Sequence, residues 1–200
     1  MQKTAEAILL AALRLFAANG YEATSVSQIA SAVGLSKGAL YRHYRSKQDL
    51  FDHILRRMEA QDAERARAFG LPEEGPEQIP EAYAHAGLDA LAAFTRSQFA
   101  YWTEDEFACA FRRMLTLEQY RSAGMGALYQ QYLGAGPLGY VRDLLAAQGL
   151  PEPDRAALSW YGPMYLSMSV YDAAPDRAAV RERLEAQLSA LTRQLKEECP

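Results

Sequence analysis

The sequence predicts an all-α protein with a small three-helix bundle at its N-terminus and a larger helical body. Three observations lead to this prediction. Apolar residues recur at intervals of three and four along most of the chain. No segment shows the alternating β-branched pattern that is typical of a strand. Residues 24–47 also have the pattern of two short helices joined by a glycine turn.

Composition allows a sizeable core. Half of the 200 residues are hydrophobic and 23% are charged, as in an ordinary globular protein. Charge is unevenly distributed, because residues 1–48 carry a net +4 and residues 49–200 a net −8. A basic end on an acidic chain indicates that any contact with nucleic acid is confined to that end.

The first helix is predicted over Thr4–Asn19, where a broad apolar stripe ends at an Asn-Gly pair. Short helices are unstable alone, so we expect this helix to supply the core for those that follow. Its stripe consists of Ile8, Leu9, Ala12, Leu13, Leu15 and Phe16.

The next two helices form the predicted helix-turn-helix, over about residues 25–44. Ser25 and Gln28 have the spacing of a capping box, and Gly34 suits a left-handed turn. Ser36 can then cap a second helix over Lys37–Tyr44.

The outer face of this second helix is small and basic, as a helix needs to be to enter a major groove about 12 Å wide. Gly38 and Ala39 would allow close approach, and Lys37 and Arg42 could reach base edges or phosphates. The full set of expected DNA-binding residues is Ser25, Ser27, Ser36, Lys37, Gly38, Ala39, Tyr41, Arg42, His43 and Lys47. From these residues alone, a helical hairpin with a solvated basic face remains an equal alternative.

A resemblance favours the DNA-binding interpretation. Residues 24–50 read T-S-V-x-x-I-A-x-x-V-G-L-S-K-G-A-L-Y-R-H-Y-x-S-K-x-x-L, and residues 20–24 read G-Y-E-A-T. This run resembles the DNA-binding signature of the TetR-type (tetracycline-repressor) regulators over about the first 55 residues. The resemblance implies a helix-turn-helix DNA-binding domain over residues 1–48 and a helical ligand-binding and dimerisation domain over residues 49–200.

The larger domain is predicted to begin with a long helix over about Lys47–Phe69, opened by Ser46 and Asp49. A loop rich in proline and glycine follows at residues 70–80 and lies inside this domain. Thr103 is expected to cap a short helix. The remaining helices are predicted over Glu81–Trp102, Glu118–Leu133, Leu138–Gln148, Pro153–Asp172 and Asp176–Lys196.

The last helix carries a leucine stripe that fits either a monomer core or a contact with a second chain. The resemblance implies a homodimer built from the last two helices of each subunit, with the two reading helices about 34 Å apart on a near-palindromic duplex operator. The expected interface residues are Leu184, Leu188, Leu191 and Leu195.

Aromatic and methionine side chains in the larger domain could line a cavity for a flat or amphipathic effector, whose identity stays open. The alternative is that they only fill the core. The candidates are Trp102, Phe107, Phe111, Met125, Tyr129, Trp160, Tyr161, Met164 and Tyr165.

Other functions find little support in the sequence. No converging catalytic set, phosphate-binding loop or metal-ligand spacing is present, so we expect neither an enzyme nor a cofactor or metal. Cys109 and Cys199 are predicted to be reduced thiols, and no apolar run is long enough for a membrane span, which favours the cytoplasm. A ligand-responsive repressor is the leading prediction, and a helical interaction module or a non-specific nucleic-acid binder is the alternative.

Overall fold

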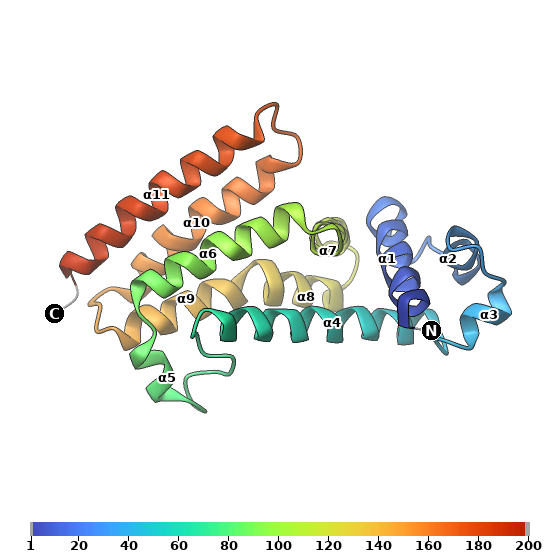
Figure 1. The fold of residues 1–200 in the computed structure, drawn as a ribbon, viewed down its shortest axis with the longest axis horizontal. Coiled ribbons are helices and arrows are strands. Elements are labelled where there is room, and N and C mark those ends of the chain that lie inside the picture. Colours follow the sequence, from blue (N-terminus) through green and yellow to red (C-terminus); the bar gives the residue numbers. More distant parts are fainter. Residues whose placement is uncertain (1, 199–200) are drawn as a thin grey trace. The chain divides into compact units, whose positions relative to one another are not determined.

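The computed structural model describes residues 2–198, which form helices and no strand (Figure 1). The helices in this range are α1 (Gln2–Asn19), α2 (Val26–Ala32), α3 (Lys37–Tyr41), α4 (Lys47–Ala68), α5 (Pro80–His85), α6 (Leu88–Glu104), α7 (Glu106–Glu118), α8 (Ala123–Leu133), α9 (Ala135–Ala147), α10 (Pro153–Tyr171) and α11 (Arg177–Glu198).

The chain divides into two compact units, at positions other than the predicted boundary at residues 48 and 49. Unit 1 comprises the chain up to Asp62 together with Asp105–Tyr129, and unit 2 comprises Ala63–Glu104 and the chain from Gln130 onward. The division differs because α7 packs along α1 and so joins the N-terminal helices, although it is distant in sequence.

Unit 1 has a core made mainly by α1, as the apolar stripe of the first helix predicts. Phe16 is completely buried, and its ring centroid lies 5.0 Å from that of Tyr21 and 6.4 Å from that of Phe51. Other fully buried side chains of this unit include Ile8, Leu13, Ile29, Leu40, Leu50, Ile54, Met58, Phe111 and Met114. The short helices α2 and α3 therefore depend on tertiary packing, as expected for their length.

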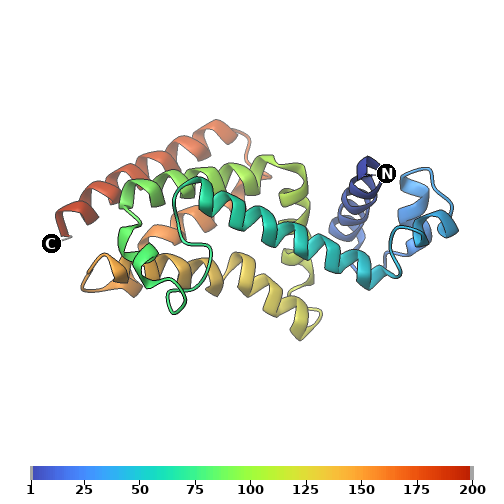
Figure 2. The same ribbon diagram turned by 60° about the horizontal axis from the view of Figure 1, so that its bottom comes forward.

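Unit 2 is built around α10, which packs against α6, α9 and α11. Figures 1 and 2 show α11 running alongside α6 and α10. Trp160 of α10 is completely buried, and its indole Nε1 donates a hydrogen bond to Thr95 Oγ1 at 2.9 Å. This bond satisfies the polar atom of the largest side chain in the core.

Several predicted helix ends are confirmed. Helix α2 ends just before Gly34, which has a φ of +68°, and α4 begins at Lys47. The proline-rich loop ends where Pro80 opens α5, since proline fits the first turn of a helix.

Several predicted boundaries are wrong, among them the start of α9, which lies at Ala135 rather than at Leu138. The segment Glu81–Trp102 is divided into α5 and α6 at residues 86–87, where Gly87 interrupts the helix. Thr103 lies inside α6 and donates to the carbonyl oxygen of Phe99, so Asp105 caps α7 instead. Helix α8 begins at residue 123 rather than 118, because Glu118 belongs to the last turn of α7.

Candidate nucleic-acid interface

Hydrogen bonds between close neighbours in sequence fix the helix-turn-helix. Ser25 Oγ accepts the Gln28 amide at 3.2 Å, and the Ser25 amide donates to Gln28 Oε1 at 2.8 Å, which completes the predicted capping box. After the turn at Gly34, the Leu35 amide reaches back to the Ala30 carbonyl at 2.9 Å. Both features were predictable because each requires only a few consecutive residues.

Helix α3 is shorter than predicted. The sequence pattern favours a helix to Tyr44, but α3 ends at Tyr41 and Arg42 is its C-cap. The amides of His43 and Tyr44 both donate to the Leu40 carbonyl, at 2.8 Å and 3.1 Å, so the last predicted turn is tightened. Tyr44 is buried and its hydroxyl donates to the Ala5 carbonyl at 3.2 Å, which ties the end of this segment to α1.

The outward face of α3 gathers four of the residues predicted to bind DNA. Lys37, Gly38, Tyr41 and Arg42 are exposed, and Leu40 on the opposite face is completely buried. The Lys37 ammonium lies 5.9 Å from the centroid of the Tyr41 ring, a spacing that favours a cation–π contact. Among the other predicted residues, Ser25, Ser27 and Ser36 are exposed, whereas Ala39, His43 and Lys47 are half-buried.

Ser36 stabilises the start of α3. Its Oγ accepts the Ala39 amide at 3.1 Å and caps α3. A hydroxyl group can accept a second hydrogen bond or donate one, so this cap leaves the side chain able to meet a phosphate.

Lys47 is held by the protein itself. Its Nζ donates to the carbonyl oxygens of Tyr21 and Glu22, at 2.8 Å and 3.3 Å, and lies 4.3 Å from the centroid of the Tyr21 ring. The sequence predicts a phosphate contact for this ammonium group. In the structure the group joins the start of α4 to the turn after α1, and its phosphate contact stays a prediction.

Tyr21 and Tyr44, which are buried beside the helix-turn-helix, are neutral hydrogen-bond donors. Burial raises the pKa of Tyr21 and of Tyr44, and the carboxylates of Glu22 and Asp49 respectively act in the same direction. The Tyr21 hydroxyl donates to Gln48 Oε1 at 3.1 Å.

Unit 1 contains a buried carboxylate that the sequence does not predict. Glu118 of α7 is 2% exposed, accepts the Tyr21 amide at 3.2 Å and pairs with Arg121 at 3.0 Å. Gly20 lies against this pair, because an added Cβ would be only 2.7 Å from Glu118 Oε1. At the other end of α7, Arg14 Nε donates to Glu106 at 2.8 Å. Partners separated by about 90 residues leave no local pattern in the sequence.

The leucine stripe of α11 lies mostly inside unit 2. Leu184, Leu188 and Leu195 are 4%, 1% and 3% exposed, and Leu191 is half-buried. A second chain could not touch the three buried side chains, so their placement does not support the predicted interface. The exposed large apolar side chains of this region lie on α10 and are Leu158, Tyr165, Leu166 and Val170.

The residues predicted to line a cavity are divided between the units. Phe107, Phe111, Met125 and Tyr129 belong to unit 1, and Trp102, Trp160, Tyr161, Met164 and Tyr165 belong to unit 2. Most of them are buried, but Tyr165 is exposed. The Tyr161 hydroxyl donates to the Leu133 carbonyl at 2.8 Å, a structural bond. An effector cavity at these residues stays a prediction.

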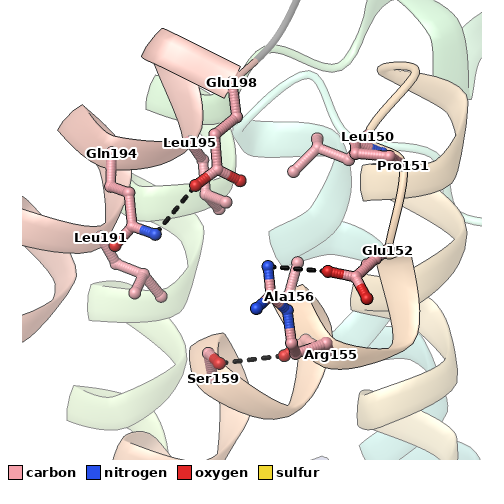
Figure 3. A pocket seen from close by; sticks show the side chains of 10 residues that line it. All are labelled: Leu150, Pro151, Glu152, Arg155, Ala156, Ser159, Leu191, Gln194, Leu195 and Glu198. Carbon is pink, nitrogen blue, oxygen red and sulfur yellow. Dashed lines mark hydrogen bonds and ion pairs between the residues drawn. The ribbon is translucent and has the colours of Figure 1, made fainter.

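A pocket of about 140 Å³ lies between the start of α10 and the end of α11 (Figure 3). Its polar rim is already engaged within the protein. Arg155 pairs with Glu152 at 2.8 Å, and the Gln194 amide donates to Glu198 at 2.9 Å. These pairs leave little reason for a polar ligand to bind there.

No helix in the described part of the chain is both long and apolar enough to cross a membrane. Within residues 2–198 no group of three or more potential metal-ligating side chains comes together. Cys109 is half-buried, and Cys199 lies outside the described residues.

The capped helix pair and its exposed basic face define a helix-turn-helix protein. Residues 8–54 match the sequence model of the bacterial regulatory proteins of the tetR family. The match to this family covers the helix-turn-helix segment and about a quarter of the chain.

Curated relatives match over part of the chain. The chain is 47% identical over 53 residues to the HTH-type transcriptional regulator AcrR of Shigella flexneri, which is 26% of this chain and 25% of the relative. It is 33% identical over 102 residues to the HTH-type transcriptional repressor BepR of Brucella suis biovar 1, which is 50% of this chain and 48% of the relative. The chain thus spans half the length of these relatives or less.

Solved structures match over nearly the whole length and support the helical fold. A transcriptional regulator of the TerR/AcrR family from Aquifex aeolicus VF5 has a TM-score of 0.66 at 19% identity, covering 94% of this chain and 99% of that one. SmeT, the repressor of the Stenotrophomonas maltophilia multidrug efflux pump SmeDEF, has a TM-score of 0.62 at 18% identity, covering 95% and 89%.

Proposed function

We propose that the protein is a sequence-specific DNA-binding transcriptional regulator, a ligand-responsive repressor that binds a near-palindromic operator as a homodimer. The observation that carries the proposal is the exposed face of α3, where Lys37, Tyr41 and Arg42 surround Gly38. Helix caps and the buried Leu40 hold this face outward. It lies within the segment that matches the tetR family.

The relatives favour repression. BepR and the AcnR proteins of three Corynebacterium species are named repressors, and so is SmeT. A repressor needs only to occupy its operator, so it needs no surface for contact with the transcription machinery.

The exposed apolar side chains of α10 support a homodimer. Leu158, Leu166 and Val170 recur at intervals of eight and four residues, so they share one face of the helix, and Tyr165 adjoins them. Apolar residues gathered on one exposed helix face are typical of a protein interface. A two-fold dimer would place two copies of α3 on successive turns of the major groove, about 34 Å apart.

An effector would act through the linkage between two equilibria. A ligand changes the affinity for DNA only if it binds one arrangement of the dimer's two helix-turn-helix segments better than the other. A SmeT–triclosan complex is known among the structural neighbours, so a related fold holds a small aromatic molecule. The buried aromatic residues around Trp160 are the candidate site for a molecule of that kind.

Selection of duplexes from a random pool tests the proposal. The recovered duplexes should share a near-palindromic sequence and bind about 10³-fold or more tightly than random DNA at moderate salt. The alternative, a non-specific nucleic-acid binder or a protein-interaction module, predicts that no sequence is enriched. A pool that stays random after several rounds would overturn the proposal.

A further inference from the structure

One face of α6 carries large side chains that solvent reaches, whereas the neighbouring face is closed. Phe94, Gln98 and Tyr101 are half-buried and follow one another at intervals of four and three residues, so they form a single stripe along the helix, here called the α6 stripe. Leu91 and Trp102 on the neighbouring face are only 2% and 4% exposed. A small molecule touches atoms that solvent reaches, so the α6 stripe is better placed to receive one than the buried face.

The first part of the α6 stripe belongs to an aromatic cluster. The ring centroid of Phe94 lies 6.0 Å from that of Phe69, which directly follows α4, and 6.2 Å from that of Tyr140 on α9. Phe69 and Tyr140 are also half-buried. Three segments of unit 2 thus bring accessible ring surface to one place, and surface of this kind binds aromatic molecules.

The second part of the α6 stripe carries a positive charge. The guanidinium carbon of Arg65 lies 3.3 Å from the centroid of the Tyr101 ring, and Arg65 Nε donates to Gln98 Oε1 at 3.1 Å. Stacking and this hydrogen bond hold the planar group in one orientation, and Arg65 is half-buried. A guanidinium has five N–H donors and stays charged at physiological pH, so it pairs well with a carboxylate.

The separation of the two parts sets the length of a molecule that meets both. Phe94 and Tyr101 are seven positions apart, which is about 10 Å along the axis of an α-helix. Two linked aromatic rings that end in a carboxylate match this separation. The rings then lie beside the cluster while the carboxylate reaches the guanidinium.

We propose that the α6 stripe is the effector site, and that the effector is an elongated aromatic acid whose rings pack against the cluster at Phe94 and whose carboxylate pairs with Arg65. This inference rests on the proposed function, and it names the place where an effector binds and the chemical class of that effector. Every contact that supports it lies within unit 2.

Isothermal titration of the full chain, without DNA, tests the proposal with biphenyl-4-carboxylate and its neutral isostere, biphenyl-4-carboxamide. We expect the acid to bind about tenfold or more tightly than the amide, because only the acid forms a charge-assisted hydrogen bond with the guanidinium. Arg65→Met should lower the affinity for the acid to that for the amide. Phe94→Leu should weaken the binding of both molecules, because it removes ring contacts and leaves the charge in place.

Arg177 provides a matched control for the charge. Its guanidinium carbon also lies near a tyrosine ring of unit 2, at 5.4 Å from the centroid of Tyr171. Arg177→Met removes the same charge and should leave both affinities unchanged. Melting temperatures show which variants are folded. The comparison of acid and amide on the unaltered chain needs no variant, so it decides the matter even if Arg65→Met does not fold.

Three results would overturn the inference. The first is equal affinity of the unaltered chain for the acid and the amide, and the second is binding of neither. The third is the same loss of affinity for the acid in Arg177→Met as in Arg65→Met. Failure of the proposed function is distinct from all three, because the chain then selects no duplex from a random pool whatever the titration shows.

Discussion

Lys47 and Tyr21 are joined by two contacts, a 2.8 Å hydrogen bond from Nζ to the Tyr21 carbonyl and a 4.3 Å approach of Nζ to the Tyr21 ring centroid. The Tyr21 amide, in turn, donates to the buried Glu118. The turn after α1 is therefore fixed from two sides, by α4 and by α7. The orientation of α2 and α3 depends on this turn, since both follow it directly.

Replacing Lys47 by alanine should therefore lower stability as well as DNA affinity. We expect a loss of about 1–3 kcal/mol in the free energy of unfolding, because hydrogen bonds to a charged donor are removed. The slope of log affinity against log salt should stay unchanged, since Nζ is engaged inside the protein. Denaturant titration and salt titration measure the two effects.

A different outcome would support the contact with a DNA phosphate that the sequence predicts for Lys47. That role requires unaltered stability together with a salt slope reduced by about one. Arg45→Ala, at an exposed position two residues earlier, serves as a control for the stability measurement.

Arg42→Ala and Lys37→Ala should leave stability nearly unchanged, because both side chains are exposed. If either residue reads a base, its loss should cost about 1–3 kcal/mol on the selected duplex and relax the preference at one position. Competition binding against single-base variants of the duplex measures this change. Equal losses on selected and random DNA would assign the residue to phosphate contact instead.

Substitution of a charged residue on the exposed face of α10 should produce monomers that remain folded. Leu166 is 63% exposed, so Leu166→Glu should abolish dimers with little effect on helicity. Leu184→Glu should instead unfold unit 2, because this side chain is buried. Light scattering with circular dichroism separates the two results, and dimers that persist in Leu166→Glu would place the interface elsewhere.

The raised pKa values of two tyrosines in unit 2 predict that the folded chain loses stability at alkaline pH. Burial raises the pKa of Tyr83 to about 12 and also raises that of Tyr140, whose hydroxyl donates to the Pro72 carbonyl at 2.8 Å. Above pH 10 the unfolded chain loses these phenolic protons while the folded chain keeps them. Stability is therefore complete below about pH 10 and declines as pH rises toward 12.

The comparison of Tyr140→Phe with the unaltered chain checks this prediction. The variant should show a shallower decline in melting temperature between pH 10 and pH 12. Tyr120, which is 88% exposed, provides the control, because Tyr120→Phe should leave the decline unchanged. A decline of equal steepness in all three proteins would contradict the assignment to Tyr140.

The helix-turn-helix could be predicted in detail because its signals are local. The capping box at Ser25 and the left-handed turn at Gly34 are each encoded within a few residues. The exposed face of α3 followed from the same short stretch. Only the end of α3 was wrong, because the Leu40 carbonyl accepts two amides and ends the helix early.

Other features depend on partners distant in sequence. The leucine stripe of α11 shows that one face is buried, but no single stripe tells whether its own chain or a second chain buries it. In unit 2, α6 and α10 cover that face. The contact between Glu118 and Tyr21 likewise joins residues that are 97 positions apart. No local pattern in the sequence therefore indicates that α7 belongs to unit 1, and the boundary predicted near residue 48 does not include it.

One ratio of affinities shows whether the face of α3 around Gly38 reads a DNA sequence. This ratio compares the affinities for the selected duplex and for a scrambled duplex of the same length and composition, measured at moderate salt. We expect a ratio of about 10³ or more, which should fall steeply in Arg42→Ala and Gly38→Ala. A ratio near one for the unaltered chain would contradict this expectation.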